Sequence, residues 1–292
     1  MERSLLYQVG EEAASPGQGE SRGAGALSAW AAELRLAEEL GLTSVWCFPV
    51  AGEAGDFSGS APEIWLAALA ARTERLRIGW GVPGMMPPTK PPFRIAEQAA
   101  ALDLSSKGRL DFAVLPGVGE STPNHVAVTE AESGEERVWD EGARMLVDMW
   151  DAPAFSWTSE RFEVMPIDVV PKPIQRPHPP IWYAGWSAEH AHRAGAGGMS
   201  YLDLSGAGDD AIEAHLNTYR KARASVDASD LLSISAFAVA AEITPNALGE
   251  ARLARWAELG VDQAVLPLSL EAGGREENEQ RIRFLASCSE AE

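Results

Sequence analysis

A buried strand that runs into a loop raises the first question of chemistry. The stretch VWCFPVAGE, Val45 to Glu53, begins with β-branched and aromatic residues that favour a strand, and it breaks at Pro49 and Gly52. No carboxylate, histidine or cationic side chain precedes Glu53 in this stretch. Glu53 is therefore the first candidate for general acid or base catalysis at this strand end.

His125 is the second catalytic candidate. It lies in the loop that follows the fourth predicted strand, and an α/β barrel places its working residues in loops of that kind. The alternative is an ordinary loop histidine. Asp56 and Asp203 are further candidates for proton handling, because each also follows or ends a predicted strand.

The other histidines and the cysteines predict no metal site. His190 and His192 are two residues apart, so on a helix they point to different faces, and we expect them to be solvated. We expect His178, among prolines, to pack and His215 to lie on a helix surface. Two cysteines, Cys47 and Cys288, give neither a disulfide framework nor a zinc pattern.

A glycine-rich stretch after the third predicted strand resembles a nucleotide motif but fails its context. GWGVPG, Gly79 to Gly84, has the G-x-G-x-x-G spacing, yet MMPPTKPP follows it. A dinucleotide fold needs a helix to begin there, and the prolines prevent one. The chain also contains no G-x-x-x-x-G-K-[ST] loop, which removes the usual support for a nucleoside triphosphatase.

Composition limits the partners and the compartment. The formal net charge of -19 repels phosphate backbones and anionic lipid, and no run of 18 apolar residues occurs. We therefore expect a cytoplasmic protein with no nucleic-acid or membrane partner. The 292 residues contain 46% hydrophobic side chains and no central linker, which favours one domain over residues 1–292.

Short apolar segments alternate with segments of helical period, a pattern typical of parallel strands joined by helices. The eight predicted strands are Ser4–Val9, Ser44–Phe48, Leu76–Trp80, Leu110–Leu115, Pro180–Ala184, Met199–Leu204, Ile234–Ala240 and Gln263–Leu268. Eight such strands in under 300 residues predict a (β/α)8 TIM-type barrel of the α/β class.

Local signals place several helix ends. The pattern from Leu27 to Leu40 stops at Gly41, Pro62 begins a helix, Ser133 with Glu136 resembles a capping box, and Thr244-Pro245 opens a later helix.

Two segments depart from the barrel repeat. Gly10–Ala26 is small and polar, and we expect a solvated loop, with a lid over the barrel mouth as the alternative. Residues of about 151–179 alternate polar and apolar and then become proline-rich, which predicts a hairpin-like insertion between the fourth helix and the fifth strand.

Several stretches together resemble the bacterial luciferase-like flavin-dependent monooxygenases. They are AEELGLTSVW, LAALAARTERLRIGWGV, PFRIAEQAAALDLSSKGRLDFAVLPG, RVWDEGARMLVDMW and PKPIQRPHPPIWYAGWS. The resemblance implies a (β/α)8 barrel with an insertion, and reduced FMN or a deazaflavin at the carboxyl end of the strands. It maps phosphate binding onto Gly185, Trp186 and Ser187, at a helix start, and onto Arg137. The alternatives are that Ser187 only caps the helix and that Arg137 only pairs with Glu141, four residues later.

The same resemblance places the flavin ring over the end of the third strand. It implies contacts from Trp80, Gly81, Val82 and Leu115, and we predict a bulge at Gly81 to Pro83 with a cis Val82–Pro83 bond. The chain also departs from the family. Pro49 and Val50 replace a frequent histidine pair, Pro91-Pro92 replaces a His-Pro, and AVLPG lacks the usual basic phosphate ligand.

The resemblance implies a two-component monooxygenase. A separate reductase would supply loosely bound reduced FMN, and O2 would oxygenate a small organic substrate in a dry aromatic mouth. The candidates for that mouth are Trp46, Phe48, Trp80, Trp182, Tyr183 and Trp186, each of which could instead be barrel core. The alternatives are deazaflavin-dependent hydride transfer and a weakly catalytic homologue acting as a partner subunit or binding protein. The apolar faces of LAALAART and AEQAAALDL permit a homodimer.

Overall fold

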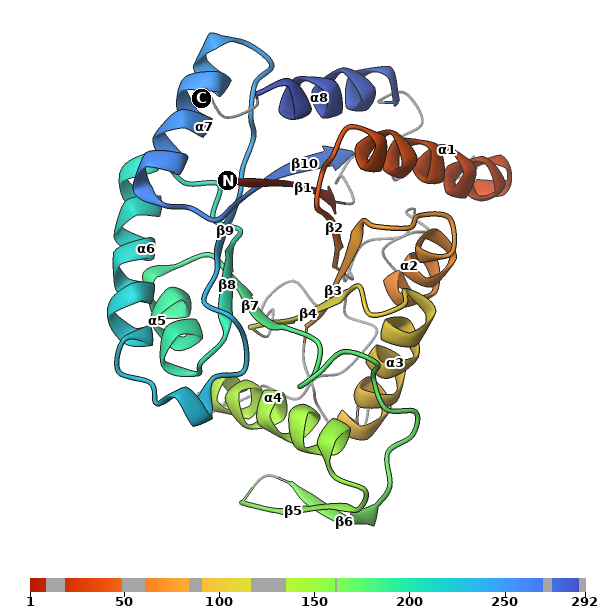
Figure 1. Cartoon of the computed structure of the whole chain (residues 1–292), viewed down its shortest axis with the longest axis vertical. Helices are drawn as coiled ribbons and strands as arrows, with labels where there is room; N and C mark the ends of the chain where they lie inside the picture. The colour runs from red at the N-terminus through yellow and green to blue at the C-terminus, as the bar shows by residue number, and fades with distance from the viewer. Residues whose placement is uncertain are drawn as a thin grey trace.

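A computed structural model of the chain describes residues 1–8, 19–48, 61–83, 91–116, 135–160, 162–269 and 275–288. Eight parallel strands close into a barrel in the order β1-β10-β9-β8-β7-β4-β3-β2, and helices surround it (Figure 1). The barrel strands are β1 Glu2–Gln8, β2 Ser44–Cys47, β3 Arg77–Pro83, β4 Leu110–Leu115, β7 Ile181–Gly185, β8 Ser200–Asp203, β9 Phe237–Ala240 and β10 Gln263–Ser269. The predicted barrel and all eight predicted strands are confirmed.

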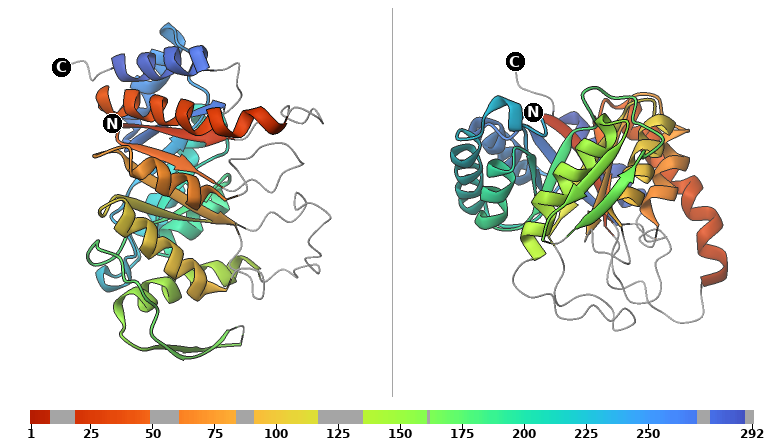
Figure 2. Two further views of the ribbon diagram at one scale, coloured as in Figure 1. Left: turned by 90° about the vertical axis from the view of Figure 1, so that its right-hand side faces the viewer. Right: turned by 90° about the horizontal axis from the view of Figure 1, so that it is seen from below.

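The helices alternate with the strands along the chain. They are α1 Gly19–Glu39, α2 Pro62–Ala70, α3 Pro92–Ser105, α4 Glu135–Asp151, α5 Ala188–Ala196, α6 Asp209–Arg223, α7 Ala247–Leu259 and α8 Arg275–Ser287, with a 3₁₀ turn η1 at Ala228–Asp230. In the side view of Figure 2 the strands run from the side where the N-terminus is marked toward the opposite side, and the helices lie outside them. The carboxyl ends of the strands therefore meet at one end of the barrel.

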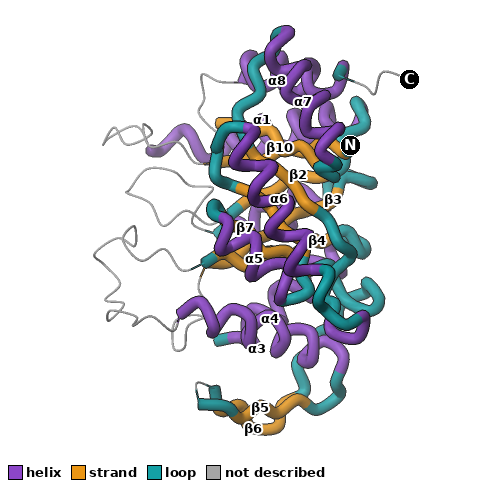
Figure 3. The backbone as a smooth tube through the Cα atoms, turned by 90° about the vertical axis from the view of Figure 1, so that its left-hand side faces the viewer, coloured by secondary structure: helices purple, strands orange, loops and turns teal. Residues whose placement is uncertain are grey.

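The predicted insertion is a two-stranded antiparallel hairpin. Strand β5, Phe155–Thr158, pairs with β6, Glu163–Ile167. Figure 3 shows the hairpin beyond α4, apart from the barrel strands. The insertion lies between the fourth helix and the fifth barrel strand, as predicted.

Helix ends agree with the sequence signals in part. Gly41 has φ +82° and ends α1, with the Leu42 N–H donating to Ala37 O at 2.9 Å, and Pro62 is the first residue of α2. Helix α7 begins later than predicted, because Asn246 accepts from the N–H groups of Leu248 and Gly249 and is its N-cap. The predicted cap at Ser133 lies outside the described residues.

The loop predicted for Gly10–Ala26 is wrong over its second part. Helix α1 already begins at Gly19, well before the amphipathic stretch that starts at Leu27. Adding turns to an existing helix costs much less than nucleating one, so the nucleus at Leu27–Glu39 can extend through Gly23 and Gly25 despite their low helix propensity.

The predicted bulge at the end of the third strand is wrong. Strand β3 pairs with β4 without a register shift, from Ile78 opposite Leu110 to Pro83 opposite Leu115. On its other side, among the described residues, β3 pairs with β2 only as far as Trp80, so the missing N–H of Pro83 interrupts no described ladder. Among the described residues the cis bonds are Val170–Pro171 and Arg176–Pro177, so the predicted cis Val82–Pro83 bond is also wrong.

Alternation along the strands divides the core into two layers. The inner layer fills the barrel and consists of Leu6, Trp46, Phe48, Ala113, Trp182, Ala184, Leu202, Ala238, Ala240 and Val265. Gly79 and Gly81 of β3 also face inward, where a Cβ on Gly79 would overlap the Trp46 ring and one on Gly81 would overlap the Phe48 ring. The G-x-G spacing of GWGVPG is therefore explained by two inward positions on one strand, each covered by an aromatic ring from the β2 segment.

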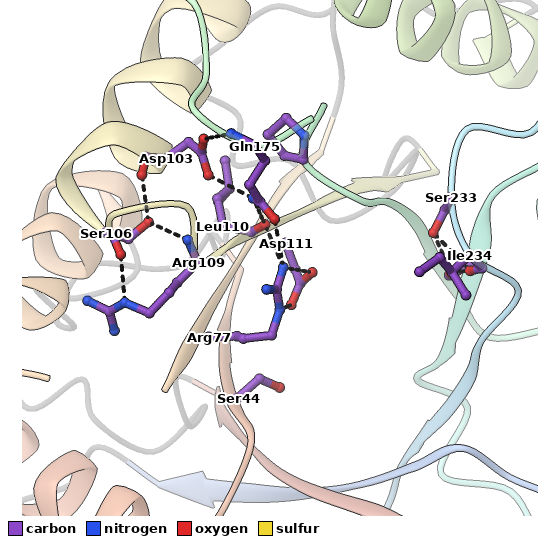
Figure 4. Close-up of polar contacts among 12 residues, drawn as sticks. Ser44, Arg77, Asp103, Ser106, Arg109, Leu110, Asp111, Gln175, Ser233 and Ile234 are labelled. Atoms are coloured by element: carbon purple, nitrogen blue, oxygen red, sulfur yellow. Dashed lines mark hydrogen bonds and ion pairs between the residues drawn. The ribbon is translucent and has the colours of Figure 1, made fainter. Parts of the chain in front are cut away.

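A polar network ties the amino end of the barrel to the segment after the hairpin (Figure 4). Arg77 donates to both carboxylate oxygens of Asp111 at 2.8 and 2.7 Å, and also to Gln175. Gln175 in turn donates to Asp103, which accepts the N–H groups of Ile174 and Gln175. This network fixes the chain leading into β7.

A buried carboxyl group lies behind β1, between α1 and α8. Glu33 accepts the Tyr7 hydroxyl at 2.6 Å and faces the amide of Asn278, and its side chain is almost fully buried. Burial raises the pKa of Glu33, although the hydrogen bonds from Tyr7 and Asn278 oppose that shift. Folding therefore shifts Glu33 toward its protonated form relative to the unfolded chain.

We predict that Gly79→Ala destabilises the barrel through overlap with the Trp46 ring. Overpacking of this kind costs about 1–3 kcal/mol, measured as the free energy of unfolding in urea. Trp46→Leu in the same chain should recover part of that loss, because it opens space above residue 79. Gly208→Ala is the control, since a Cβ added there would meet nothing within 4 Å and only the smaller cost of replacing an N-cap glycine with alanine is expected. Equal effects of the two alanine variants would contradict the packing argument.

We predict that Glu33→Gln stabilises the protein increasingly as pH rises. The pKa of this carboxyl group is higher in the folded than in the unfolded protein. Its contribution to the free energy of unfolding is therefore fully present below the unfolded pKa of about 4.3 and is lost as pH rises through the folded pKa. Glutamine cannot ionise, so the two unfolding free energies should agree near pH 4 and diverge toward pH 8. Glu160→Gln, at an exposed position, controls for the change in net charge. Parallel stability curves for Glu33→Gln and wild type would refute this account.

Candidate functional site

The best-defined candidate site is the loop Gly185–Ser187, which joins the carboxyl end of β7 to α5. Ser187 is the N-cap of α5, with extended backbone, and its Oγ accepts the His190 N–H at 3.2 Å. Gly185 is buried, whereas Trp186, Ser187 and Ala188 reach solvent. The loop thus presents a helix start at the functional end of the barrel.

Two carbonyl groups of this loop accept hydrogen bonds from within the protein. Gly185 O accepts the Leu204 N–H at 2.6 Å, and Ser187 O accepts the Ala191 N–H and the Tyr201 hydroxyl. The N–H groups of residues 187–189 have no acceptor within the described part of the chain. Outward N–H groups at a helix start carry partial positive charge, and this arrangement suits a phosphate group.

One acidic side chain stands in the first turn of α5. Glu189 is paired with Arg193 at 3.1 Å, one turn further along the helix. The ion pair offsets the negative charge that Glu189 would otherwise place beside a bound anion. Ser187 Oγ accepts one hydrogen bond and keeps its own proton for donation to an anion.

The inner wall near the end of β3 is apolar. A Cβ on Gly81 would lie 2.7 Å from Leu115 and would overlap Phe48, so these two side chains converge over Gly81. Trp182 also faces inward, with its ring 5.3 Å from that of Trp46. Its buried Nε1–H has no acceptor among the described residues.

The structure does not bring all the predicted mouth residues together. Trp46, Phe48 and Trp182 lie inside the barrel, but Trp80, Val82 and Tyr183 belong to the layer between strands and helices. For Trp80 and Tyr183 the alternative of barrel core holds and the mouth does not, because alternate strand residues face opposite sides of the sheet. Trp186 is 44% exposed at the start of α5.

Asp203 is not free for proton handling. Its buried carboxylate binds His215 Nδ1 at 2.7 Å and accepts the Ser205 N–H at 2.8 Å. It faces α6, on the outer side of β8. His215, predicted as a surface residue, is mostly buried because it pairs with this carboxylate.

The burial of the other histidines could not be predicted from helical spacing alone. His190 is buried, so its predicted solvation is wrong, whereas His192 is exposed. His190 packs where Gly185 leaves room, since a Cβ on Gly185 would lie 2.6 Å from the His190 Cβ. His178 packs near Trp150 and contacts Pro179 O, as predicted.

Several candidates cannot be placed. Glu53, Asp56, His125, Pro49 and Val50 lie outside the described residues. Arg137 lies in α4, and its side chain belongs to the undescribed set. Within the described residues there is no cluster of three or more potential metal ligands, and no helix there is long and apolar enough to span a membrane.

Comparison with known proteins identifies the family. The sequence profile described as luciferase-like monooxygenase matches residues 8–287. The chain belongs to this family. The barrel is similar to the crystal structure of the monooxygenase RslO1 from Streptomyces bottropensis, with a TM-score of 0.73, 20% identity and 98% of each chain covered, which supports the fold alone.

Curated relatives of this luciferase-like chain include proteins with two different cofactors. An F420-dependent glucose-6-phosphate dehydrogenase from Amycolatopsis mediterranei is 30% identical over 59% of this chain and 52% of its own length. An FMNH2-dependent dimethylsulfone monooxygenase from Pseudomonas putida is 25% identical over 62% of this chain and 49% of its own. The chain thus spans about half the length of these curated relatives.

We predict that His215→Ala lowers stability without affecting cofactor binding. The buried Asp203 carboxylate would lose its closest partner, which costs about 1–3 kcal/mol in the free energy of unfolding. His192→Ala, at an exposed position on α5, should change that free energy by much less. Loss of cofactor binding in a folded His215→Ala protein would contradict this prediction and show that the Asp203–His215 pair contributes to the cofactor site.

Proposed function

We propose that this chain is a flavin-dependent monooxygenase that takes reduced FMN from a separate reductase and uses O2 to oxygenate a small organic substrate. The observation that carries the proposal is the Gly185–Ser187 loop: Gly185 O and Ser187 O accept hydrogen bonds from within the protein, and the N–H groups of residues 187–189 have no acceptor among the described residues. Membership of the luciferase-like monooxygenase family adds support.

The residues at this site fit the phosphate end of FMN. The N–H groups of Ser187 and Ala188, with the Ser187 hydroxyl, would hold the phosphate, and we propose Arg137 as an additional cation. Gly81, Leu115 and Phe48 form an apolar surface against which the flavin ring would lie. The proposed contacts of Trp80 and Val82 are limited to their backbone, because their side chains face the helices.

When bound, reduced FMN would supply the electrons and the reaction with O2. The contribution of the protein is then to bind and orient the cofactor and to exclude water. Phe48, Trp182 and Leu115 are apolar or aromatic and suit that role. Glu53 and His125 remain our candidates for proton transfer to or from the substrate.

Deazaflavin-dependent hydride transfer is the second candidate function. A relative named as F420-dependent favours it, and the α5 loop suits the phosphate of either cofactor. A deazaflavin cofactor carries additional carboxylates beyond its phosphate, and a protein with a net charge of -19 disfavours them. We therefore place FMN first.

Titration of the purified protein with each reduced cofactor tests the proposal. We expect reduced FMN to bind under nitrogen, and a flavin reductase with NADH and O2 to support oxygenation of a panel of small ketones, sulfones and aromatic compounds. Ser187→Ala should weaken FMN binding by about tenfold, equivalent to about 1.4 kcal/mol.

Other results would change the assignment. Binding of reduced deazaflavin with O2-independent turnover would favour hydride transfer. Failure of both cofactors to bind would remove both enzyme assignments and leave a binding protein or a partner subunit.

A further inference from the structure

We propose that His190 is the positioning residue of the phosphate-binding loop, and that FMN affinity depends on its imidazole accepting a hydrogen bond. The inference rests on the proposed function, because it concerns the same loop. It assigns to a buried histidine of α5 the task of holding Gly185–Ser187 in the conformation that turns N–H groups outward.

His190 contacts each residue of the loop. Its Nδ1 accepts the Trp186 N–H at 3.2 Å, and its own N–H donates to Ser187 Oγ at 3.2 Å. The Trp186 ring stands edge-on to the imidazole with centroids 4.8 Å apart. Accepting from Trp186 requires a lone pair on Nδ1, so the proton of the neutral ring lies on Nε2.

Gly185 shows that the loop is shaped around this side chain. A Cβ added to Gly185 would lie 2.6 Å from the Cβ and 2.9 Å from the Cγ of His190, so any larger residue would displace the imidazole. Gly185 itself has its carbonyl bonded to Leu204. The contact between Gly185 and His190 therefore couples the end of β7 to the first turn of α5.

An apolar side chain could fill the same space but could not accept from Trp186. Burying an imidazole costs free energy, unless its polar atoms make hydrogen bonds, whereas burying a leucine side chain carries no such cost. His190 is only 7% exposed, and its Nδ1 accepts a hydrogen bond from the N–H of Trp186, the central residue of the loop. With the Trp186 N–H bonded inward, the following N–H groups, of residues 187–189, are left for an external anion.

The test compares reduced FMN with reduced riboflavin, which lacks only the phosphate, by anaerobic titration of the full chain. We expect wild type to bind FMN at least about tenfold more tightly than riboflavin, as charge-assisted hydrogen bonds to one phosphate allow. His190→Leu should reduce this ratio to about twofold or less while riboflavin affinity stays within about twofold.

Asparagine is the conservative variant, because its Oδ1 can take the place of Nδ1. His190→Asn should restore most of the preference for FMN. His192→Leu, two residues along the same helix and exposed, is the matched control and should leave the preference unchanged. Gly185→Ala should lose the preference as His190→Leu does, because the new Cβ pushes the imidazole away.

The outcomes separate this inference from the proposed function. A wild-type protein that binds FMN and riboflavin equally would remove the phosphate site and with it both proposals. A wild-type preference for FMN that persists in His190→Leu, or that His190→Asn fails to restore, would overturn the role of His190 alone. Equal loss of both ligands in a folded His190→Leu protein would also overturn it, since a general packing role predicts that result.

Discussion

The barrel depends on the fit between two aromatic rings of the β2 segment and two glycines of β3. Trp46 and Phe48 project inward over Gly79 and Gly81, where no larger residue can stand without a shift of the rings. A closed eight-stranded barrel has a fixed interior, so large residues on one strand require small ones nearby. The inner layer of β9 is likewise built from small residues, both of them alanines. This complementarity fills the barrel and leaves an apolar wall below its mouth.

The two ends of the barrel have different chemistry. At the amino end, Arg109 donates to Ser106, Thr73, Leu76 and Ala70 and so joins the end of α2 to the start of β4. These bonds use carbonyl groups that a helix end and a turn would otherwise leave unpaired. All the partners of Arg109 in these bonds belong to the amino end of the barrel. Function at the carboxyl end can then vary while the barrel is kept.

Prediction from sequence succeeded for the strands, because buried parallel strands are apolar on both faces and stand out from amphipathic helices. For the same reason it could not say which face points inward. In the structure Gly79 faces the Trp46 ring inside the barrel, so the neighbouring Trp80 lies among the helices. Polar pairs between distant segments were also beyond it, since His215 finds its partner Asp203 on another element. The burial of His190 depends on the space that Gly185 leaves. In a sequence, a glycine at that position indicates a loop equally well, so the burial was not predictable.

The absence of carboxylate, histidine and cationic side chains before Glu53 in VWCFPVAGE can now be related to the fold. Where this stretch is described, it supplies packing, since Trp46 and Phe48 close the interior over β3. N–H groups without an acceptor among the described residues lie instead where β7 meets α5, beside Gly185 O and Ser187 O, which are bonded within the protein. One wall is suited to an apolar ring and the other to an anion. A cofactor that carries both parts, and performs its own redox chemistry, needs little more from the protein than this separation.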